Sequence, residues 1–111
     1  MSSLVKDNGN ITLTRGDTFI ATVNLFDKDN EPQTLQEGDA IRFALKMDYD
    51  DETVLIHKDI PIDTMVLYLA PEDTKDLEFG SYVYDIQVTF ANGVIDTVMP
   101  KKQFIIAEEV E

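Results

Sequence analysis

The sequence contains no cysteine. This absence excludes disulfide bonds, thiolate metal sites and cysteine nucleophiles, so the stability of the fold must come from packing alone. It leaves the compartment open, because a domain without disulfides is compatible with reducing and oxidising surroundings. No apolar run approaches the ~20 residues of a membrane-spanning helix, and the first residues lack the apolar core of a signal peptide. We therefore expect a soluble protein made in the cytoplasm.

Basic residues are scarce. The 111 residues include nine Lys and Arg against 22 Asp and Glu, which gives a net charge of −13. This charge repels a phosphate backbone and an anionic membrane, so we expect neither nucleic acid nor a membrane as partner. Three interpretations of the acidity stay open: solubility, docking on a basic partner, and calcium binding.

Groups that carry catalysis are also few. The serines are Ser2, Ser3 and Ser81, and the one histidine is His57, which we interpret as an ordinary surface residue. None of them belongs to a nucleophile motif, and no glycine-rich phosphate-binding motif is present. The carboxylates of residues 48–52 lie in one short loop, and glycoside hydrolysis also needs a deep cleft. We expect no enzyme activity and no cofactor.

Calcium binding is the best metal hypothesis that the chain offers. The Asp27–Glu31 segment has carboxylates at alternate positions, as calcium loops do. It has Pro32 and Gly38 where such a loop has glycine at its sixth position and glutamate at its twelfth. We therefore interpret Asp27–Glu31 and the acidic Asp48–Glu52 loop as polar turns and predict no metal site. Weak calcium affinity of either loop stays open.

Apolar and polar residues alternate in short segments separated by turn signals, which is typical of antiparallel sheets with one buried face. The tripeptide Arg15-Gly16-Asp17 matches an integrin-recognition sequence, but it lies where a turn is needed between two strands. Asn92-Gly93 predicts a hairpin turn with positive φ at both residues. Pro100 interrupts the last alternating segment. The expected strands are residues 11–13, 18–26, 40–47, 54–60, 64–69, 82–90, 94–99 and 103–107.

Residues 70–88 are the most informative stretch. Pro71 fits the first position of a helix, Glu72 and Asp73 suit its positive end, and Gly80 marks the exit. Tyr82 then begins an alternating strand, two residues before Tyr84. Immunoglobulin-like sandwiches place a tyrosine there, and its hydroxyl bonds to the backbone of the corner.

These patterns predict an all-β fold, an immunoglobulin-like antiparallel β-sandwich of about 7–9 strands with one short helical turn near residues 71–77. A small barrel is the alternative architecture. We expect a polar lead-in at residues 1–9, a single sandwich domain at 10–107 and an acidic tail at 108–111. Met47 also faces inward in this pattern. The predicted core consists of Phe19, Val23, Leu25, Ile41, Phe43, Leu45, Leu67, Leu69, Tyr82, Tyr84, Ile86 and Val88.

Four apolar residues fall on the faces opposite the predicted core: Ile20, Val66, Tyr68 and Val83. A sandwich alone would leave them in solvent. Isolated exposed apolar residues are common, but a cluster of them marks an interaction surface. We predict that these four residues form a docking face on one sheet, for another subunit or for a second copy.

The chain as a whole resembles a group of small proteins encoded by phages and prophages of Gram-positive bacteria, and among them the N-terminal domain of phage baseplate upper proteins. The resemblance covers most of residues 10–107. Its most telling part is the Gly-x-Tyr-x-Tyr-Asp-Ile segment. The matching segments are Thr14-Arg15-Gly16-Asp17-Thr18, the turn at 27–32, Gly38-Asp39 with the strand at 41–46, Pro71-Glu72-Asp73-Thr74, and Phe79-Gly80-x-Tyr82-x-Tyr84-Asp85-Ile86.

The resemblance implies an immunoglobulin-like structural piece of a virion, at the baseplate, tail or fibre base, made in the host cytoplasm and then built into the particle. Its partners would be other virion proteins and other copies of itself, and the family carries over no catalytic residues. Baseplate upper proteins continue beyond this domain, whereas this chain stops at Glu111, so a fragment and a free-standing relative both stay open. The alternative function is a carbohydrate- or cell-surface-binding module that uses loops at one end, where Tyr49 is the well-placed aromatic residue.

Overall fold

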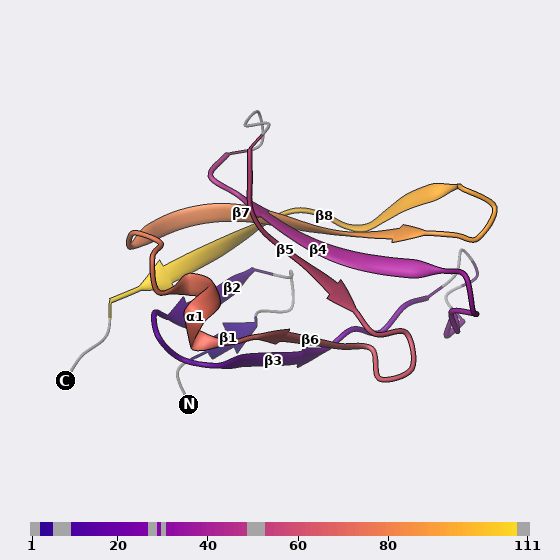
Figure 1. Cartoon of the computed structure of the whole chain (residues 1–111), viewed down its shortest axis with the longest axis horizontal. Coiled ribbons are helices and arrows are strands. Elements are labelled where there is room, and N and C mark those ends of the chain that lie inside the picture. The colour runs from indigo at the N-terminus through magenta and orange to yellow at the C-terminus, as the bar shows by residue number, and fades with distance from the viewer. Residues whose placement is uncertain (1–2, 6–9, 27–28, 30, 49–52, 109–111) are drawn as a thin grey trace.

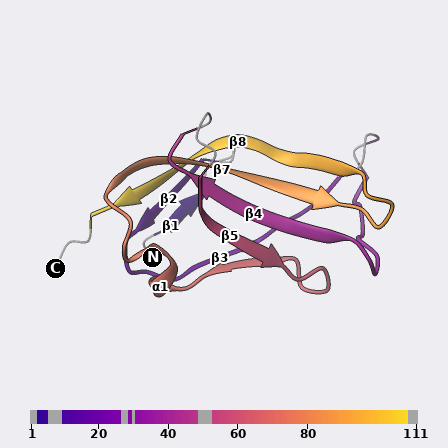
Figure 2. The same ribbon diagram turned by 45° about the horizontal axis from the view of Figure 1, so that its top comes forward.

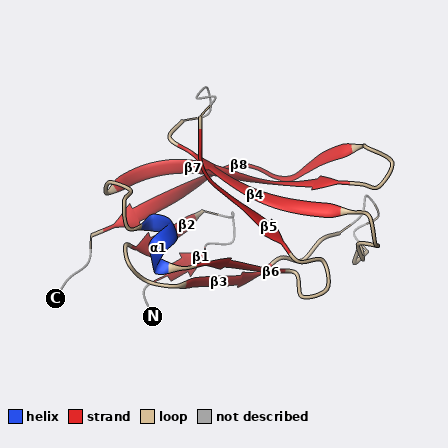
Figure 3. Ribbon diagram, in the orientation of Figure 1, coloured by secondary structure: helices blue, strands red, loops and turns tan. Residues whose placement is uncertain are grey.

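The computed structural model describes residues 3–5, 10–26, 29, 31–48 and 53–108. These residues form eight strands and one short helix, so the protein is an all-β sandwich, as predicted (Figure 3). The elements are β1 (Ser3–Val5), β2 (Ile11–Thr14), β3 (Phe19–Thr22), β4 (Ala40–Lys46), β5 (Val54–Ile60), β6 (Val66–Leu69), α1 (Pro71–Thr74), β7 (Gly80–Thr89) and β8 (Ile95–Ala107).

The described strands form two sheets. The larger sheet has six strands in the order β1-β2-β8-β7-β4-β5, and the smaller sheet is the pair β3-β6. Figure 1 shows β3 and β6 lying side by side beneath β4, β7 and β8, and the turned view in Figure 2 shows β5, the edge strand of the larger sheet, beside β4. Neighbouring described strands pair antiparallel, except that β2 and β8 run parallel. β2 and β8 can run parallel because they are far apart in the sequence and are not joined by a hairpin.

The strand order is that of an immunoglobulin-like sandwich. In that fold, strands C, F and G share one sheet, which strand C′ extends in variable-type domains, and strands B and E belong to the opposite sheet. Here β4, β7 and β8 take the places of C, F and G, β5 takes that of C′, and β3 and β6 take those of B and E.

Alternation along the strands fills the space between the sheets. In β4, Ile41, Phe43 and Leu45 are buried while Arg42 is exposed. All the predicted core residues are buried except Val23, which is half-buried against the core. The core also takes in buried residues from outside that list: Ile11, Leu13, Leu35, Ile56, Ile60, Phe104 and Ile106. The Phe43 ring contacts those of Tyr84 and Phe104, with centroids 5.4 and 6.1 Å away.

One inward assignment was wrong. Met47 was expected to continue the buried face of β4, but its side chain is 53% exposed. The strand ends at Lys46, where its pairing with β5 also slips by one residue. The alternation of apolar and polar residues no longer predicts which side chains face the core beyond the end of the strand.

The smaller sheet is shorter than its sequence pattern. β3 ends at Thr22 instead of residue 26, and β6 begins at Val66 instead of residue 64. Met65 has a positive φ of 56°, so the backbone bends sharply just before β6. Val23 still donates its N–H to the Met65 carbonyl oxygen at 2.8 Å, which adds one bond beyond the regular pairing.

The C-terminal segments form one strand instead of two. β8 runs from Ile95 to Ala107 through Pro100, which was expected to divide it. The register between β7 and β8 shifts between Tyr84 and Ile86 and again between Ile86 and Gln87. A bulge leaves a residue unpaired, so a proline without an N–H is tolerated there.

Two turn regions also differ from expectation. Within the predicted lead-in, Ser3–Val5 forms β1, which pairs with β2. At the hairpin after β7, Gly93 has a positive φ of 91° but Asn92 does not. Phe90 donates its N–H to the Val94 carbonyl oxygen and accepts from Gly93, both at 2.8 Å. The connection is therefore a three-residue loop with one left-handed glycine.

The corner between α1 and β7 has the predicted construction. Asp73 accepts the Ala70 N–H at 2.8 Å, which caps the short helix that starts at Pro71. The Tyr82 hydroxyl donates to the Glu78 carbonyl oxygen at 2.6 Å, although Tyr82 itself is 3% exposed. The tyrosine corner is confirmed, and it ties the start of β7 to the chain just before it.

Candidate functional site

Three of the four residues predicted to form a docking face do lie together. Ile20 on β3 and Tyr68 on β6 are directly opposite each other in the antiparallel pair, and their side chains are 62% and 51% exposed. Thr22 and Val66 form the next rung with the same facing. We call these four residues, Ile20, Thr22, Val66 and Tyr68, the small-sheet face. Thr22 was missed because only apolar residues were considered, although its spacing from Ile20 places it on the same side.

Val83 does not belong to this face. It lies on β7 in the larger sheet, opposite Lys46 on β4 and Gln103 on β8. Because alternate residues of β7 point into the core, Val83 points to the outside of the larger sheet, away from β3 and β6. The alternation in the sequence indicates that a residue points outward, but it does not indicate to which of the two sheets that residue belongs. The predicted docking face was therefore wrong to include Val83.

The small-sheet face carries no charge. Residues 18–26 and 64–71 contain no Asp, Glu, Lys or Arg, although such residues make up 28% of the chain and its net charge is −13. Asp17 and Asp63 stand just before the two uncharged segments. Interface cores in proteins are depleted of charge and enriched in tyrosine. The acidity of the chain therefore lies around this face and not on it.

The main chain of β3 is paired on one side only. Within the described residues, β6 is the single hydrogen-bonded neighbour of β3. The Val23 N–H bonds to the carbonyl oxygen of Met65, the residue directly opposite. In an antiparallel pair, every second pair of opposite residues is hydrogen-bonded, so the other hydrogen-bonded pairs are Ala21–Leu67 and Phe19–Leu69. The N–H and C=O groups of Ile20 and Thr22 therefore point away from β6, along an edge that no described strand covers.

An apolar slot of about 130 Å³ opens beside this edge. Its walls come from both sheets and include Ile11, Ala21, Val23 and Ile86. Tyr84 also lines it, and burial raises the pKa of its hydroxyl to about 12. The slot holds no pair of groups suited to nucleophilic or acid–base catalysis, because its described lining is almost entirely apolar.

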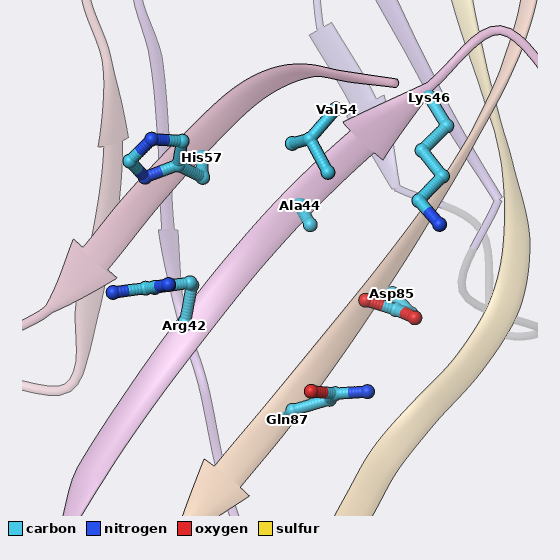
Figure 4. Close-up of a pocket in the computed structure, with 7 residues that line it drawn as sticks. All are labelled: Arg42, Ala44, Lys46, Val54, His57, Asp85 and Gln87. Carbon is cyan, nitrogen blue, oxygen red and sulfur yellow. The ribbon is translucent and has the colours of Figure 1, made fainter. Parts of the chain in front are cut away.

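A second surface lies on the outside of the larger sheet. A shallow hollow of about 260 Å³ is lined from β4, β5 and β7 by Arg42, Lys46, His57, Asp85 and Gln87, with Ala44 and Val54 between them. Figure 4 shows Ala44 in the middle of the polar side chains, with Lys46 and Asp85 on one side and His57 on the other. His57 is exposed, as predicted. Arg42 contacts Asp59 at 3.2 Å, and both side chains are largely exposed, so this ion pair adds little stability.

The Arg15-Gly16-Asp17 tripeptide forms the predicted turn, in which Asp17 donates its N–H to the Thr14 carbonyl oxygen at 3.1 Å. The Arg15 side chain folds back onto the protein. Its guanidinium donates to the Leu77 carbonyl oxygen at 3.3 Å and lies 4.2 Å from the centre of the Phe79 ring. Arg15 therefore fastens the first turn to the segment that precedes β7.

The two calcium hypotheses fall largely outside the described residues. Residues 27–28, 30 and 49–52, which include Tyr49, lie in the parts of the acidic loops that the structure does not describe. Among the described residues, no three acidic, histidine or cysteine side chains are grouped so that they could hold a metal ion.

Neither a family model nor a curated protein sequence matches the chain at a significant level. In the described part of the chain, no helix is both long enough and apolar enough to cross a membrane.

Proposed function

We propose that the protein is a non-enzymatic assembly module of a phage or prophage particle, at the baseplate, tail or fibre base, and that it acts by docking to other virion proteins through the small-sheet face. The observation that carries this proposal is the concentration of exposed apolar side chains, Ile20 and Tyr68, on an uncharged face of a strongly acidic chain. The resemblance of residues 10–107 to baseplate upper proteins supplies the virion context.

Leaving the apolar side chains of the small-sheet face in water is energetically unfavourable. Covering an apolar patch lowers the free energy of the system by about 25 cal/mol for each Å² of apolar surface removed from water. Charged side chains in a contact must lose hydration at a high cost, whereas Ile20 and Val66 have no polar group to desolvate and the uncharged hydroxyls of Thr22 and Tyr68 cost much less. The surrounding acidic residues keep the free protein soluble and favour basic surfaces at long range.

The experiment is to induce prophages in the bacterium that encodes the chain and to purify particles by density gradient. Mass spectrometry of the particle fraction should find this chain at a stoichiometric ratio to the other tail proteins. An Ile20→Lys variant should be lost from the particles, and a Gln87→Lys variant, which adds the same charge to the other sheet, should be retained. A chain found in the lysate but absent from particles would overturn the proposal.

A ligand-binding module is the second candidate. The observation that favours it is the polar hollow on β4, β5 and β7, whose lining includes the hydrogen-bonding side chains of Arg42, His57, Asp85 and Gln87. It ranks second because no Phe, Tyr or Trp side chain among the described residues lines this hollow, and sugar sites typically stack sugars on such rings. Nuclear magnetic resonance titration with a panel of oligosaccharides tests it, and shifts confined to these residues would support it.

A further inference from the structure

The edge of β3 that no described strand covers offers backbone hydrogen-bonding groups in addition to the apolar side chains of the small-sheet face. The N–H and C=O groups that no described strand pairs belong to Ile20 and Thr22, which flank Ala21 symmetrically. A strand added antiparallel to this edge meets two donors and two acceptors at fixed spacing. Edges of this kind are usually protected by charges, prolines or bulges, and residues 18–26 have neither a charge nor a proline.

We infer that the occupant of this edge is a second copy of the chain, with β3 paired antiparallel to β3 across a two-fold axis through Ala21. This inference rests on the proposed docking function and adds a second copy of the chain to its partners. The axis places Ile20 of each copy opposite Thr22 of the other, and each such rung closes with two N–H···O bonds. The two small sheets become one four-stranded sheet in the order β6-β3-β3-β6.

The side chains suit this pairing. Ala21, the residue on the axis, points toward the core side and is small, so the two copies meet there without a clash. On the outer side, each Ile20 lies beside a Thr22, and paired β-branched side chains stabilise neighbouring strands. The rows continue through Tyr68 and Val66, so the joined outer face is uncharged from one β6 to the other.

The charge pattern favours a second copy over a different partner at this edge. An acidic or basic partner strand finds no opposite charge on residues 18–26, whereas a second copy brings no like charges together there. The edge of β5, by contrast, carries Lys58 and Asp59. The net charge of −13 on each copy still repels at long range. Salt screens that repulsion, so self-association through this edge strengthens as salt is added.

The test is light scattering and sedimentation of the full chain, from micromolar to millimolar concentration, at low and high salt. We expect a dimer whose fraction rises with concentration and with salt. Thr22→Pro removes an N–H that points away from β6, so it should abolish the dimer while leaving the pairing of β3 with β6 intact. Ile20→Lys should abolish it by placing two lysines beside the axis. The matched control, Gln87→Lys, should remain dimeric. Circular dichroism verifies that each variant is folded.

Hydrogen exchange gives a second readout at the level of single amides. In the dimer, the amides of Ile20 and Thr22 should become protected, and those of Ala21 should not change, because they already bond to β6. A wild-type chain that is monomeric at every concentration and salt overturns the inference. So does a dimer that survives both β3 variants, or one that dissociates as salt is added.

The particle experiment separates this inference from the proposed function. A monomeric chain that is still built into particles refutes self-pairing and leaves the assembly role in place. A β3-paired dimer that is absent from particles supports self-pairing and refutes the assembly role.

Discussion

The outer faces of the two sheets are built in contrasting ways. The face of the larger sheet presents Arg42, Lys46, His57 and Asp85, and its central strands are hydrogen-bonded on both sides. The small-sheet face presents exposed Ile20 and Tyr68 without any charge, and its strand β3 is hydrogen-bonded on one side within the described residues. The comparison teaches that the charged residues of this chain are not spread evenly over the two sheets. The larger sheet has a charged outer face that suits solvent, whereas the smaller sheet has the uncharged composition that is typical of a contact surface.

The largest predicted effect tests whether this difference extends to the inner faces. Phe43 on the larger sheet and Phe19 on the smaller are 0% and 1% exposed. Replacing either with Ala should reduce the free energy of unfolding by about 3–5 kcal/mol, through lost apolar contact and the cavity left behind. Urea unfolding of both variants gives the two values. A loss at Phe19 of less than half the loss at Phe43 would show that the small sheet is only loosely attached to the core.

The second prediction concerns Tyr84, which lines the slot between the sheets. Burial raises its pKa from 10.0 to about 12. Above pH 10, tyrosine in the unfolded chain ionises first, so the unfolded state binds fewer protons and stability falls as pH rises toward 12. The contribution is fully present below pH 10 and amounts to at most about 2 kcal/mol.

Urea unfolding at a series of alkaline pH values measures this loss, and Tyr84→Phe is the control. The variant should lose less stability than the wild type over the same range. Equal slopes for the two proteins would mean that Tyr84 exchanges with solvent through the slot, and the slot would then be a permanent opening.

A third prediction concerns the joint between the sheets. The Tyr82 hydroxyl bonds to the Glu78 carbonyl oxygen at 2.6 Å, so Tyr82→Phe leaves a backbone acceptor without this donor. The expected cost is about 1 kcal/mol or slightly more. Thermal and urea unfolding measure it. A cost near zero would mean that water replaces the hydroxyl and that the corner is held by packing instead.

These residues show how far the sequence could predict the fold. Alternation located β4 and β7 because their periods are uninterrupted. The sequence of β5 has mixed facing, and that strand was bounded by Pro61, which follows it. The tyrosine corner was predictable because it depends on local spacing. The early end of β3 at Thr22 was not predictable, since it coincides with the positive φ of Met65, which lies much further along the chain. The passage of β8 through Pro100 depends on bulges that only the pairing with β7 creates.

The candidate site was predicted only in part, for a related reason. Outward facing is a property of one strand and can be read from alternation, which identified Ile20, Val66 and Tyr68. Whether two outward residues share a face depends on which strands are neighbours, and this separated Val83 from the others. The free edge of β3 is the absence of a neighbour among the described strands, so a local pattern cannot reveal it.

A fourth, smaller effect should appear at the helix that connects the two sheets. Thr74 is 0% exposed, and its hydroxyl has no hydrogen-bond partner among the described residues. Thr74→Val replaces the hydroxyl with a methyl group of similar shape, so it should stabilise the protein by up to about 1 kcal/mol. Unfolding in urea measures the change, with Thr74→Ser as the control that keeps the hydroxyl. Destabilisation by valine would indicate that the hydroxyl bonds to a buried water.

The smallest effect returns to the two outer faces. In dilute solution, where we expect a monomer, Ile20→Thr on β3 and Gln87→Thr on β7 should each change the free energy of unfolding by no more than about 0.5 kcal/mol, because both side chains are exposed. At high concentration and high salt the same pair should diverge. Ile20→Thr should then lower the apparent stability relative to the wild type, since a dimer that forms only from folded chains adds to stability by mass action. Thermal unfolding over a dilution series measures both conditions. If the two variants stayed equal at every concentration, the contrast between the faces would be one of composition without consequence for association.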